Sequence, residues 1–310
     1  MPEHAKKDVL PIIDAHMHLN RDMPAEQLIE LMDRAGVKSM VLMARYYRSR
    51  RSAGNGSDEQ ALQYAAHYPG RFIPFIAGQR PILVRKRMWT DPTHWKATSF
   101  LKKTKAKAQS GKFHGLGEFI MYHHAYSVYG SQGGGDVDIP VDSSLMHQFA
   151  KIGAEHNLPV LIHLEGEPDK LTAMISLLEK EPNTKFIWAH SCGRISAEQT
   201  RELLTRFPNL YCDLAGMTRV RKGGYGNLWP RYTRWIHPIE NGNGRLYPEM
   251  KKLYEDFSDR FLIGTDCAHT PALKTYEQRI YRFRVLLSQL TPATAGKLAY
   301  QNAEKMFGLK

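Results

Sequence analysis

One repeating unit constrains the fold of this chain more than any other feature: a short apolar segment, a loop, and an amphipathic segment with helical spacing. We expect strands at residues 12–19, 38–45, 72–79, 113–120, 158–165, 185–191, 209–215 and 261–267. We expect helices at residues 25–35, 57–68, 94–109, 141–156, 169–180, 196–207, 246–258, 274–289 and 292–306. Alternating strands and helices are typical of parallel β-α-β units.

Eight such units that close on themselves make an α/β fold of the (β/α)8 or TIM-barrel type. A chain of 310 residues is long enough for one such barrel, so we expect residues 1–310 to form a single domain. A doubly wound open sheet would produce a similar pattern and is the alternative. The three longest irregular segments, 80–93, 121–140 and 216–245, each follow a strand. In a barrel they would lie on the face where active sites form, so we expect them to be active-site loops.

Composition narrows the class of protein. Hydrophobic residues make up 42% of the chain, which supports a full core. No run of 18 or more apolar residues occurs, so no membrane-spanning segment is expected. Residues 1–8 lack the apolar stretch of a signal peptide, so a cytoplasmic location is the default expectation, with export expected if the chain is a processed form. The cysteines, Cys192, Cys212 and Cys267, form no Cys-x-x-Cys pair, and we interpret them as buried thiols rather than a disulfide framework.

The chain is strongly basic, with a formal net charge of +12 and a pI of about 9.5. Such a balance attracts anions, which include nucleic acid, acidic membranes and small anionic substrates. Lys102, Lys103, Lys105 and Lys107 share one predicted helix and indicate a solvent-exposed face. The sequence contains no recognised nucleic-acid module and no long basic stripe, which argues against nucleic acid as the partner. We therefore expect a small-molecule substrate and leave a homo-oligomer open.

The first predicted strand carries the pair His16-Met17-His18. Side chains alternate along a strand, so Asp14, His16 and His18 would share one face. Two imidazoles about 7 Å apart along a strand can hold one metal ion between them. Asp14 would either orient one of these histidines or serve as a buried structural carboxylate. A single His-x-His pair is weak support for a metal site, so the rest of the chain decides.

Four further residues of metal-ligand type lie at the ends of predicted strands: Glu118, His163, His190 and Asp266. An ionisable side chain at the end of an apolar strand is costly to bury unless it is paired or bound to a metal. The carboxyl ends of all strands in a barrel meet at one face. The sequence therefore predicts that these side chains converge with the histidine pair on one pocket.

At these residues the sequence resembles the amidohydrolase superfamily of metal-dependent TIM-barrel hydrolases, and most of all the branch that includes lactonases and decarboxylases. The resemblance covers nearly the whole chain and rests on the histidines above, on residues 260–266 and on residues 302–308. It implies that His16, His18 and His163 bind metal. It also implies that His190 binds a second metal or contacts the substrate, and that Asp266 is both a ligand and the general base.

The metal count is open in this resemblance. The commonest two-metal pattern of the family has a carbamylated lysine on strand 4 that bridges the ions. Here Glu118 occupies that strand, as in some deoxyribonuclease-like members in which a glutamate is the bridge. One or two divalent ions are therefore expected. Imidazole and carboxylate ligands suit Zn²⁺ best, with Mn²⁺ or Fe²⁺ as alternatives.

The residue types also indicate the reaction. A metal ion of this class lowers the pKa of a bound water toward about 7, and Asp266 would take the water's proton. The sequence thus predicts a metal-dependent hydrolase, of amidohydrolase type, that acts on a small ester, lactone or amide. A decarboxylase on the same scaffold is one alternative. A metal-dependent nuclease or nucleic-acid-binding protein, suggested by the charge and by Glu118, is another.

Arginines gather in the segments expected around the pocket. Residues 216–245 contain Arg219 among several other arginines and aromatic residues, while Arg45 and Arg80 end the second and third strands. Arginine binds carboxylate or phosphate through two parallel hydrogen bonds. We therefore predict an anionic substrate that contacts these arginines and His269, which follows Asp266 by three positions.

Overall fold

The computed structural model describes residues 10–46, 56–80, 83, 85–91, 93–124, 126–128, 131–134, 137–218 and 236–309. Its first sheet contains β1 (Ile12–Asp14) and β2 (His18–Leu19), which both pair in parallel with β3 (Val37–Ala44), and β4 (Phe72–Phe75), which also pairs with β3. The predicted first strand is thus broken into two short pieces. The break leaves residues 15–17, which include His16, outside the two strands, and His18 begins β2.

The second sheet has the order β12 (Phe261–Leu262), β11 (Leu210–Asp213), β10 (Phe186–Trp188), β9 (Val160–Leu164) and β5 (Leu116–His123), all parallel. The short strand β8 (Val137–Asp138) adds to its edge in antiparallel direction. All eight strand regions predicted from the sequence therefore form in the described part of the chain.

Parallel bridges join the two sheets at both seams. At one seam Ile76 bridges Leu116, and the Ile76 amide donates to the Gly115 carbonyl oxygen at 2.9 Å. At the other, Met17 bridges Cys267, and the Ala15 amide donates to the Ile263 carbonyl oxygen at 2.8 Å. The strands therefore run in a ring. The TIM-barrel prediction is confirmed, and the open-sheet alternative is excluded.

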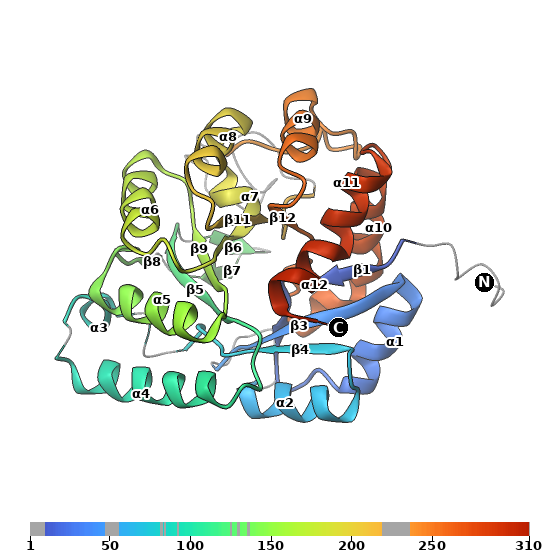
Figure 1. Ribbon diagram of the computed structural model, residues 1–310. Helices are drawn as coiled ribbons and strands as arrows, with labels where there is room; N and C mark the ends of the chain where they lie inside the picture. Colours follow the sequence, from blue (N-terminus) through green and yellow to red (C-terminus); the bar gives the residue numbers. More distant parts are fainter. Residues whose placement is uncertain are drawn as a thin grey trace.

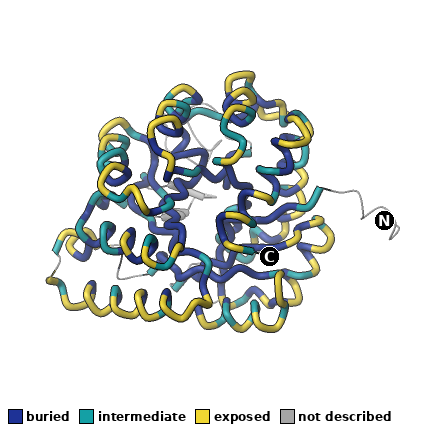
Figure 2. The backbone as a smooth tube through the Cα atoms, in the orientation of Figure 1, coloured by how far each residue is buried: buried dark blue, intermediate teal, exposed yellow. Residues whose placement is uncertain are grey.

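The helices surround the strands (Figure 1). They are α1 (Ala25–Ala35), α2 (Asp58–His67), α3 (Lys86–Thr90), α4 (Trp95–Gln109), α5 (Ser144–His156), α6 (Pro168–Lys180), α7 (Ala189–Arg194), α8 (Ala197–Arg206), α9 (Pro248–Asp256), α10 (Tyr276–Leu287), α11 (Pro292–Gly296) and α12 (Asn302–Phe307). Figure 2 shows their outer faces exposed and the strands buried. The sequence predicts no membrane-spanning segment, and among the described residues no helix is long and apolar enough to cross a bilayer.

Local sequence signals explain where several helices begin and end. Ser196 and Gln199 form a capping box at the start of α8, in which each side chain accepts a hydrogen bond from the other residue's backbone amide. Gly36 ends α1 with a left-handed φ of 68°, a conformation that lets its amide reach the last carbonyl oxygens of the helix. The sequence missed α3, β8 and the hairpin of β6 (Tyr126–Val128) and β7 (Ser131–Gly134), which all lie in the predicted loops.

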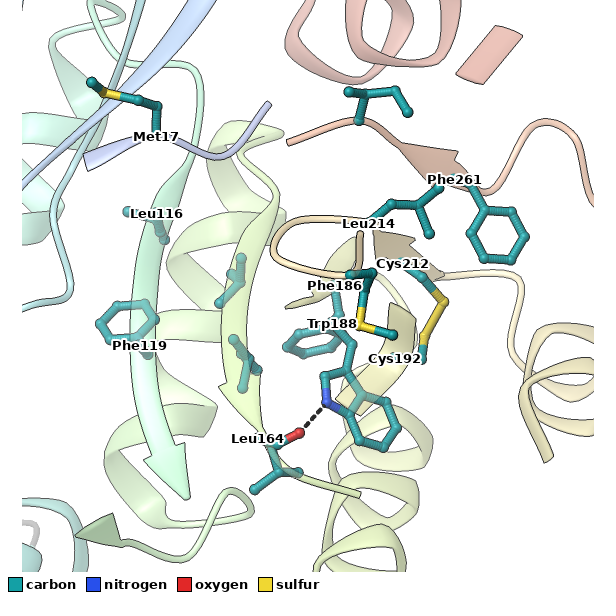
Figure 3. Packing of buried hydrophobic residues seen from close by; sticks show 14 of the residues in the cluster. Met17, Leu116, Phe119, Leu164, Phe186, Trp188, Cys192, Cys212, Leu214 and Phe261 are labelled. Carbon is teal, nitrogen blue, oxygen red and sulfur yellow. Dashed lines mark hydrogen bonds between the residues drawn. A yellow bond between two sulfur atoms is a disulfide. The ribbon is translucent and has the colours of Figure 1, made fainter. Parts of the chain in front are cut away.

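Two layers of apolar side chains hold the barrel together. One lies between strands and helices and includes Leu116, Phe119, Trp188 and Phe261 (Figure 3). The other belongs to the barrel interior, where side chains such as Phe75 meet residues of α12. The rings of Phe75 and Phe307 pack edge to face with centroids 5.3 Å apart. The C-terminal helix thereby packs against the barrel interior, near the residues that precede β5 and β12, because the Phe307 carbonyl oxygen contacts His114 and Asn302 donates to the Ser258 carbonyl oxygen.

The cysteine interpretation is wrong for two of the three residues. Cys192 and Cys212 form a disulfide, and Cys267 is a buried free cysteine. The partners lie 20 positions apart, on α7 and on β11, so only the fold brings them together.

Removing the aromatic ring of Phe307, on α12, tests whether this helix stabilises the barrel interior. Phe307→Ala should lower the free energy of unfolding by about 3–5 kcal/mol, the usual cost of removing a buried aromatic ring. Urea denaturation would measure the change. Trp95→Ala is the matched control, since that side chain is 71% exposed. Equal, small effects of both substitutions would contradict the role of α12.

Candidate metal centre

The first group of ligand types joins the histidine pair to β5. His16 lies in the break after β1 and His18 begins β2, and their Nε2 atoms lie 3.3 Å apart. The Glu118 carboxylate reaches both rings, with Oε1 3.6 Å from His16 Nε2 and Oε2 3.4 Å from His18 Nε2. All three side chains are buried, and their ligand atoms lie close enough together to hold a metal ion.

A second group shares the same carboxylate. His163 on β9 places Nδ1 3.1 Å from Glu118 Oε1 and 2.9 Å from His190 Nε2. The His190 Nε2 atom is 3.7 Å from Glu118 Oε1. Glu118, His163 and His190 could therefore hold an ion of their own. A carboxylate common to two ligand groups is the arrangement expected of a bridge between two ions.

Asp266 completes the cluster from the end of the eighth strand. Its Oδ1 lies 3.5 Å from His18 Nε2 and 3.9 Å from His16 Nε2. Its backbone has a left-handed φ of 50°, and its amide donates to the His16 carbonyl oxygen at 2.8 Å. The Asp266 side chain is 30% exposed, compared with 12% for His163 and less for the other members of the cluster. It is the acidic group of the cluster with the best access to solvent.

Acceptors behind the histidines fix which nitrogen faces the cluster. Asp213 on β11 accepts the Nδ1 hydrogen of His16 at 2.9 Å, and the Ala215 carbonyl oxygen accepts that of His190 at 2.7 Å. The Nε2 lone pairs of both rings therefore point inward, toward two carboxylates. Such a buried group of electron-pair donors is stable around a cation, so the donor set fits a divalent metal ion.

His163 is oriented by a buried ion pair. Its Nε2 atom lies 3.1 Å from Glu165 Oε1, and Arg194 pairs with the same oxygen. Burial tends to raise the pKa of Glu165, but the charge of Arg194 and the hydrogen bond from His163 outweigh it and lower this pKa to about 2. The ionised carboxylate can thus accept the Nε2 hydrogen and leave Nδ1 of His163 free to face Glu118.

The electrostatic environment of the cluster strongly favours positive charge. Burial tends to lower the pKa of His163, but hydrogen bonds to Glu118 and Glu165 outweigh it and raise the pKa to about 9. The pKa of His16 is likewise raised, because the charges of Asp213 and Glu118 overcome burial. The pKa of Asp266 is lowered despite burial by the hydrogen bond to His18 and the charges of His16 and His190. Protons would therefore occupy the cluster whenever no other cation does.

A model of the amidohydrolase family matches residues 13–309, nearly the whole chain. The protein belongs to the amidohydrolase family. No protein of curated function matches the sequence.

Solved structures of this family share the fold. An uncharacterised TIM-barrel protein from Bordetella bronchiseptica matches with a TM-score of 0.61 at 16% identity, covering 97% of this chain and 99% of that one. A probable 2-pyrone-4,6-dicarboxylic acid hydrolase from Acinetobacter baumannii, with citric acid bound, has a TM-score of 0.53 at 16% identity and coverages of 96% and 99%. A 2,6-dihydroxybenzoate decarboxylase from Rhizobium has a TM-score of 0.50 at 15% identity and coverages of 97% and 99%.

Asp14 has a structural role, and Asp213 is the carboxylate that orients a histidine. Asp14 accepts hydrogen bonds from the amide and hydroxyl of Thr265, at 2.9 and 2.7 Å, and so ties the first strand to the eighth. Complete burial raises the pKa of Asp14 to about 6. Of the two roles left open by the sequence, the contacts favour the structural one.

The structure places the residues predicted to contact the substrate in different surroundings. Arg45 is buried and lies 2.8 Å from Nδ1 of His269, so these two are brought together. Arg80 instead pairs with the buried Asp58 at 2.7 Å and stacks on Tyr46. Arg219 lies outside the described residues. A substrate role for each of these arginines stays a prediction.

Arg45 also belongs to a chain of contacts that reaches Glu118. Its Nε donates to the Gln79 side-chain oxygen at 3.1 Å, and the Gln79 amide donates to Glu118 Oε2 at 2.8 Å. This chain fixes the orientation of the shared carboxylate. Sequence reasoning missed Gln79, although it immediately precedes Arg80 at the end of the predicted third strand.

Three other site residues were missed: Glu165, Arg194 and Asp213. Asp213 closes the predicted seventh strand and Glu165 follows His163 by two positions, so both fitted the rule of polar residues at strand ends. Arg194 gave no such signal. Its place depends on an unusual backbone turn, formed by residues 190–194 and called here the left-handed turn.

All five residues of the left-handed turn have positive φ, with values of 60°, 54°, 55°, 70° and 65° from His190 to Arg194. This conformation costs a residue other than glycine roughly 1–2 kcal/mol. Gly193 is the one glycine among them, and a Cβ there would lie 2.5 Å from the Leu164 carbonyl oxygen. The surrounding structure must therefore hold the turn in place.

Asp213→Asn should weaken metal binding by about 10–100-fold, the usual effect of altering a group that orients a ligand. The two Asp213 oxygens accept from His16 Nδ1 and from the amides of His190 and Ala215. The side chain of asparagine has one such oxygen, so at least one donor loses its partner. Competition with a chromogenic chelator would measure affinity, with the exposed Asp169→Asn as control. Equal affinities would remove Asp213 from the site.

Metal binding should also release protons at neutral pH. The metal-free enzyme holds a proton on His163, whose pKa is about 9, and only the neutral imidazole binds metal. Affinity should therefore rise with pH and level off above about 9. Calorimetric titrations in buffers of different ionisation enthalpy would count the protons. Affinity that is independent of pH below that value would contradict the electrostatic account.

Proposed function

We propose that the protein is a metal-dependent hydrolase that uses water to cleave a small, anionic ester, lactone or amide. The carrying observation is the buried Glu118 carboxylate, shared between two groups of metal-ligand side chains, with Asp266 beside the first group. His16, His18 and Glu118 would hold one ion, and Glu118, His163 and His190 a second. Zinc suits this donor set best, with Mn²⁺ or Fe²⁺ as alternatives.

A divalent ion bound here would supply Lewis acidity, which polarises a carbonyl oxygen and lowers the pKa of a nearby water. The side chains of the protein do the rest. Asp266 is ionised at neutral pH because its pKa is lowered, and its side chain is partly exposed to solvent. It would take a proton from the attacking water and return it to the leaving group.

Two observations support an anionic substrate. The chain has a net charge of +12, and Arg45 and His269 lie together at the ends of β3 and of the eighth strand. The related pyrone-dicarboxylic acid hydrolase, which holds citric acid, is named for a substrate with two carboxylates. The proposed active-site loops, 80–93, 121–140 and 216–245, would complete the pocket.

A decarboxylase is the second candidate, because a 2,6-dihydroxybenzoate decarboxylase shares the fold. In that reaction Asp266 would deliver a proton to the carbon that loses its carboxylate, and no water would be consumed. A panel of esters, lactones, amides, hydroxybenzoates and DNA, offered to the zinc-loaded enzyme, separates the candidates. Hydrolysis of carboxylate-bearing substrates supports the proposal. Release of CO₂ alone, cleavage of DNA alone, or no turnover by metal-loaded protein would overturn it.

Asp266→Asn should reduce kcat by at least ~10²-fold, the lower end of the contribution of a proton-transfer group. The amide cannot accept the proton, so the acidic limb of the pH–rate profile should change as well. Metal content of the variant, measured in parallel, controls for a lost ligand. A metal-loaded variant with a near-normal rate and an unchanged profile would exclude Asp266 as the base.

A further inference from the structure

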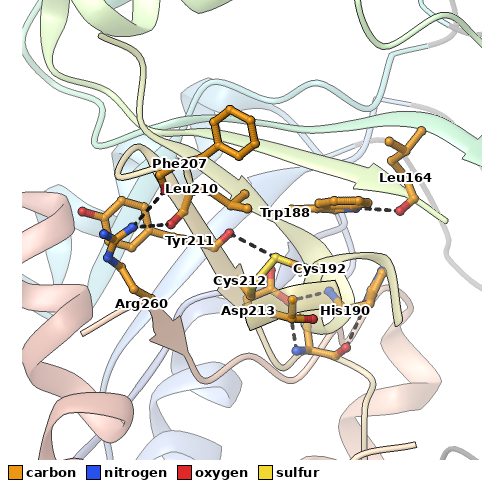
Figure 4. The surroundings of a disulfide bond; sticks show 12 residues. Leu164, Trp188, His190, Cys192, Phe207, Leu210, Tyr211, Cys212, Asp213 and Arg260 are labelled. Atoms are coloured by element: carbon orange, nitrogen blue, oxygen red, sulfur yellow. Dashed lines mark hydrogen bonds between the residues drawn. A yellow bond between two sulfur atoms is a disulfide. The ribbon is translucent and has the colours of Figure 1, made fainter. Parts of the chain in front are cut away.

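A disulfide lies directly behind the second ligand group. Cys192 belongs to the left-handed turn, two residues after His190, and Cys212 lies on β11, immediately before Asp213. Both cysteines are fully buried. Figure 4 shows the bond beside His190 and Asp213. A covalent link thus joins the segment that carries one ligand type to the strand that orients another.

The left-handed turn is held at several points. The His190 amide donates to Asp213 at 3.0 Å, the Gly193 carbonyl oxygen accepts from the Gly166 amide at 2.9 Å, and the Arg194 carbonyl oxygen accepts from the His237 amide at 2.8 Å. The disulfide holds the middle of the turn. Cys192 itself has φ 55° and ψ 55°, a conformation that a residue with a Cβ avoids unless it is constrained.

We propose that the Cys192–Cys212 disulfide is a positioning clamp for the metal centre. It keeps the turn left-handed, so that His190 Nε2 stays beside Glu118 and Asp213 stays under both ligand groups. When the bond is absent, the turn relaxes toward negative φ and His190 leaves the second group. The inference rests on the proposed function, because it concerns how the second ion is retained.

A clamp differs from a simple stabilising crosslink. Disulfides ordinarily stabilise proteins by restricting the unfolded chain. Loss of such a crosslink would lower the stability of a variant without changing how its folded form binds metal. A clamp acts on the folded state and therefore on metal affinity. Backbone preference at position 192 separates the two, since glycine adopts positive φ without steric cost and alanine does not.

The experiment compares two double variants, Cys192→Ala/Cys212→Ala and Cys192→Gly/Cys212→Ala. Both variants lack the disulfide and both of its sulfur atoms, so no new free thiol is created. The two variants differ from each other by one methyl group, at position 192. Phe307→Ala is the control for lost stability, because its side chain packs with Phe75 and α12, apart from the ligand cluster. Zn²⁺ affinity and stoichiometry are measured for all three and for the parent by competition with a chelator.

The clamp predicts that the alanine variant binds the second ion at least ~10-fold more weakly than the parent, as for other groups that orient ligands. The Zn²⁺ affinity of the glycine variant should lie between those of the alanine variant and the parent. The affinity of Phe307→Ala should match that of the parent. Equal affinities in all four proteins would overturn the clamp and leave the proposed function standing. A parent protein that binds no divalent ion would overturn both.

If the double variants do not fold, reduction of the parent gives the same test. Tris(2-carboxyethyl)phosphine takes an oxygen atom from water to form its oxide, and the disulfide gains two electrons and two protons to become two thiols. Hydrogen exchange at residues 190–194 should then rise relative to β9, and one ion should be released. Unchanged exchange and full metal retention, with both thiols confirmed by mass spectrometry, would overturn the clamp.

Discussion

The buried carboxylate of Glu118 is the constraint on which the rest of the site depends. It lies 3.1 to 3.7 Å from the imidazoles of four histidines, which come from three of the predicted strand regions. A carboxylate removed from water is tolerated when cations and hydrogen-bond donors surround it. Gln79 supplies one donor, and the acceptors behind the histidines turn ring nitrogens toward it. The whole arrangement therefore favours a positive charge at its centre.

The barrel and the ligand types were predictable because their signals are local. Apolar strand segments alternate with amphipathic helices, and a polar residue such as His163 or Asp266 ends an apolar strand. Parallel strands in a ring then bring these ends together without further information. The same reasoning could not place Asp14, whose carboxylate bonds Thr265 across a seam of the barrel. Which of several polar strand residues faces the pocket depends on strand breaks and register shifts that a sequence pattern does not reveal.

The features that could not be predicted are those set by tertiary packing. The Cys192–Cys212 disulfide joins residues that become neighbours once β10 and β11 pair, and a spacing of 20 carries no signal for this. The left-handed turn is equally hidden, since four of its five residues are not glycine. The sequence pattern predicts that Arg80 lies at the end of the third strand, but it does not predict the ion pair with Asp58, which comes from the start of α2.

The central claim is that Glu118 is shared between two metal ions. Anomalous diffraction from crystals of zinc-loaded protein, recorded at the zinc absorption edge, tests it most directly. The account predicts two peaks on either side of the Glu118 carboxylate, one bounded by His16 and His18 and the other by His163 and His190. A single peak that Glu118 does not touch, or peaks elsewhere on the protein, would contradict it.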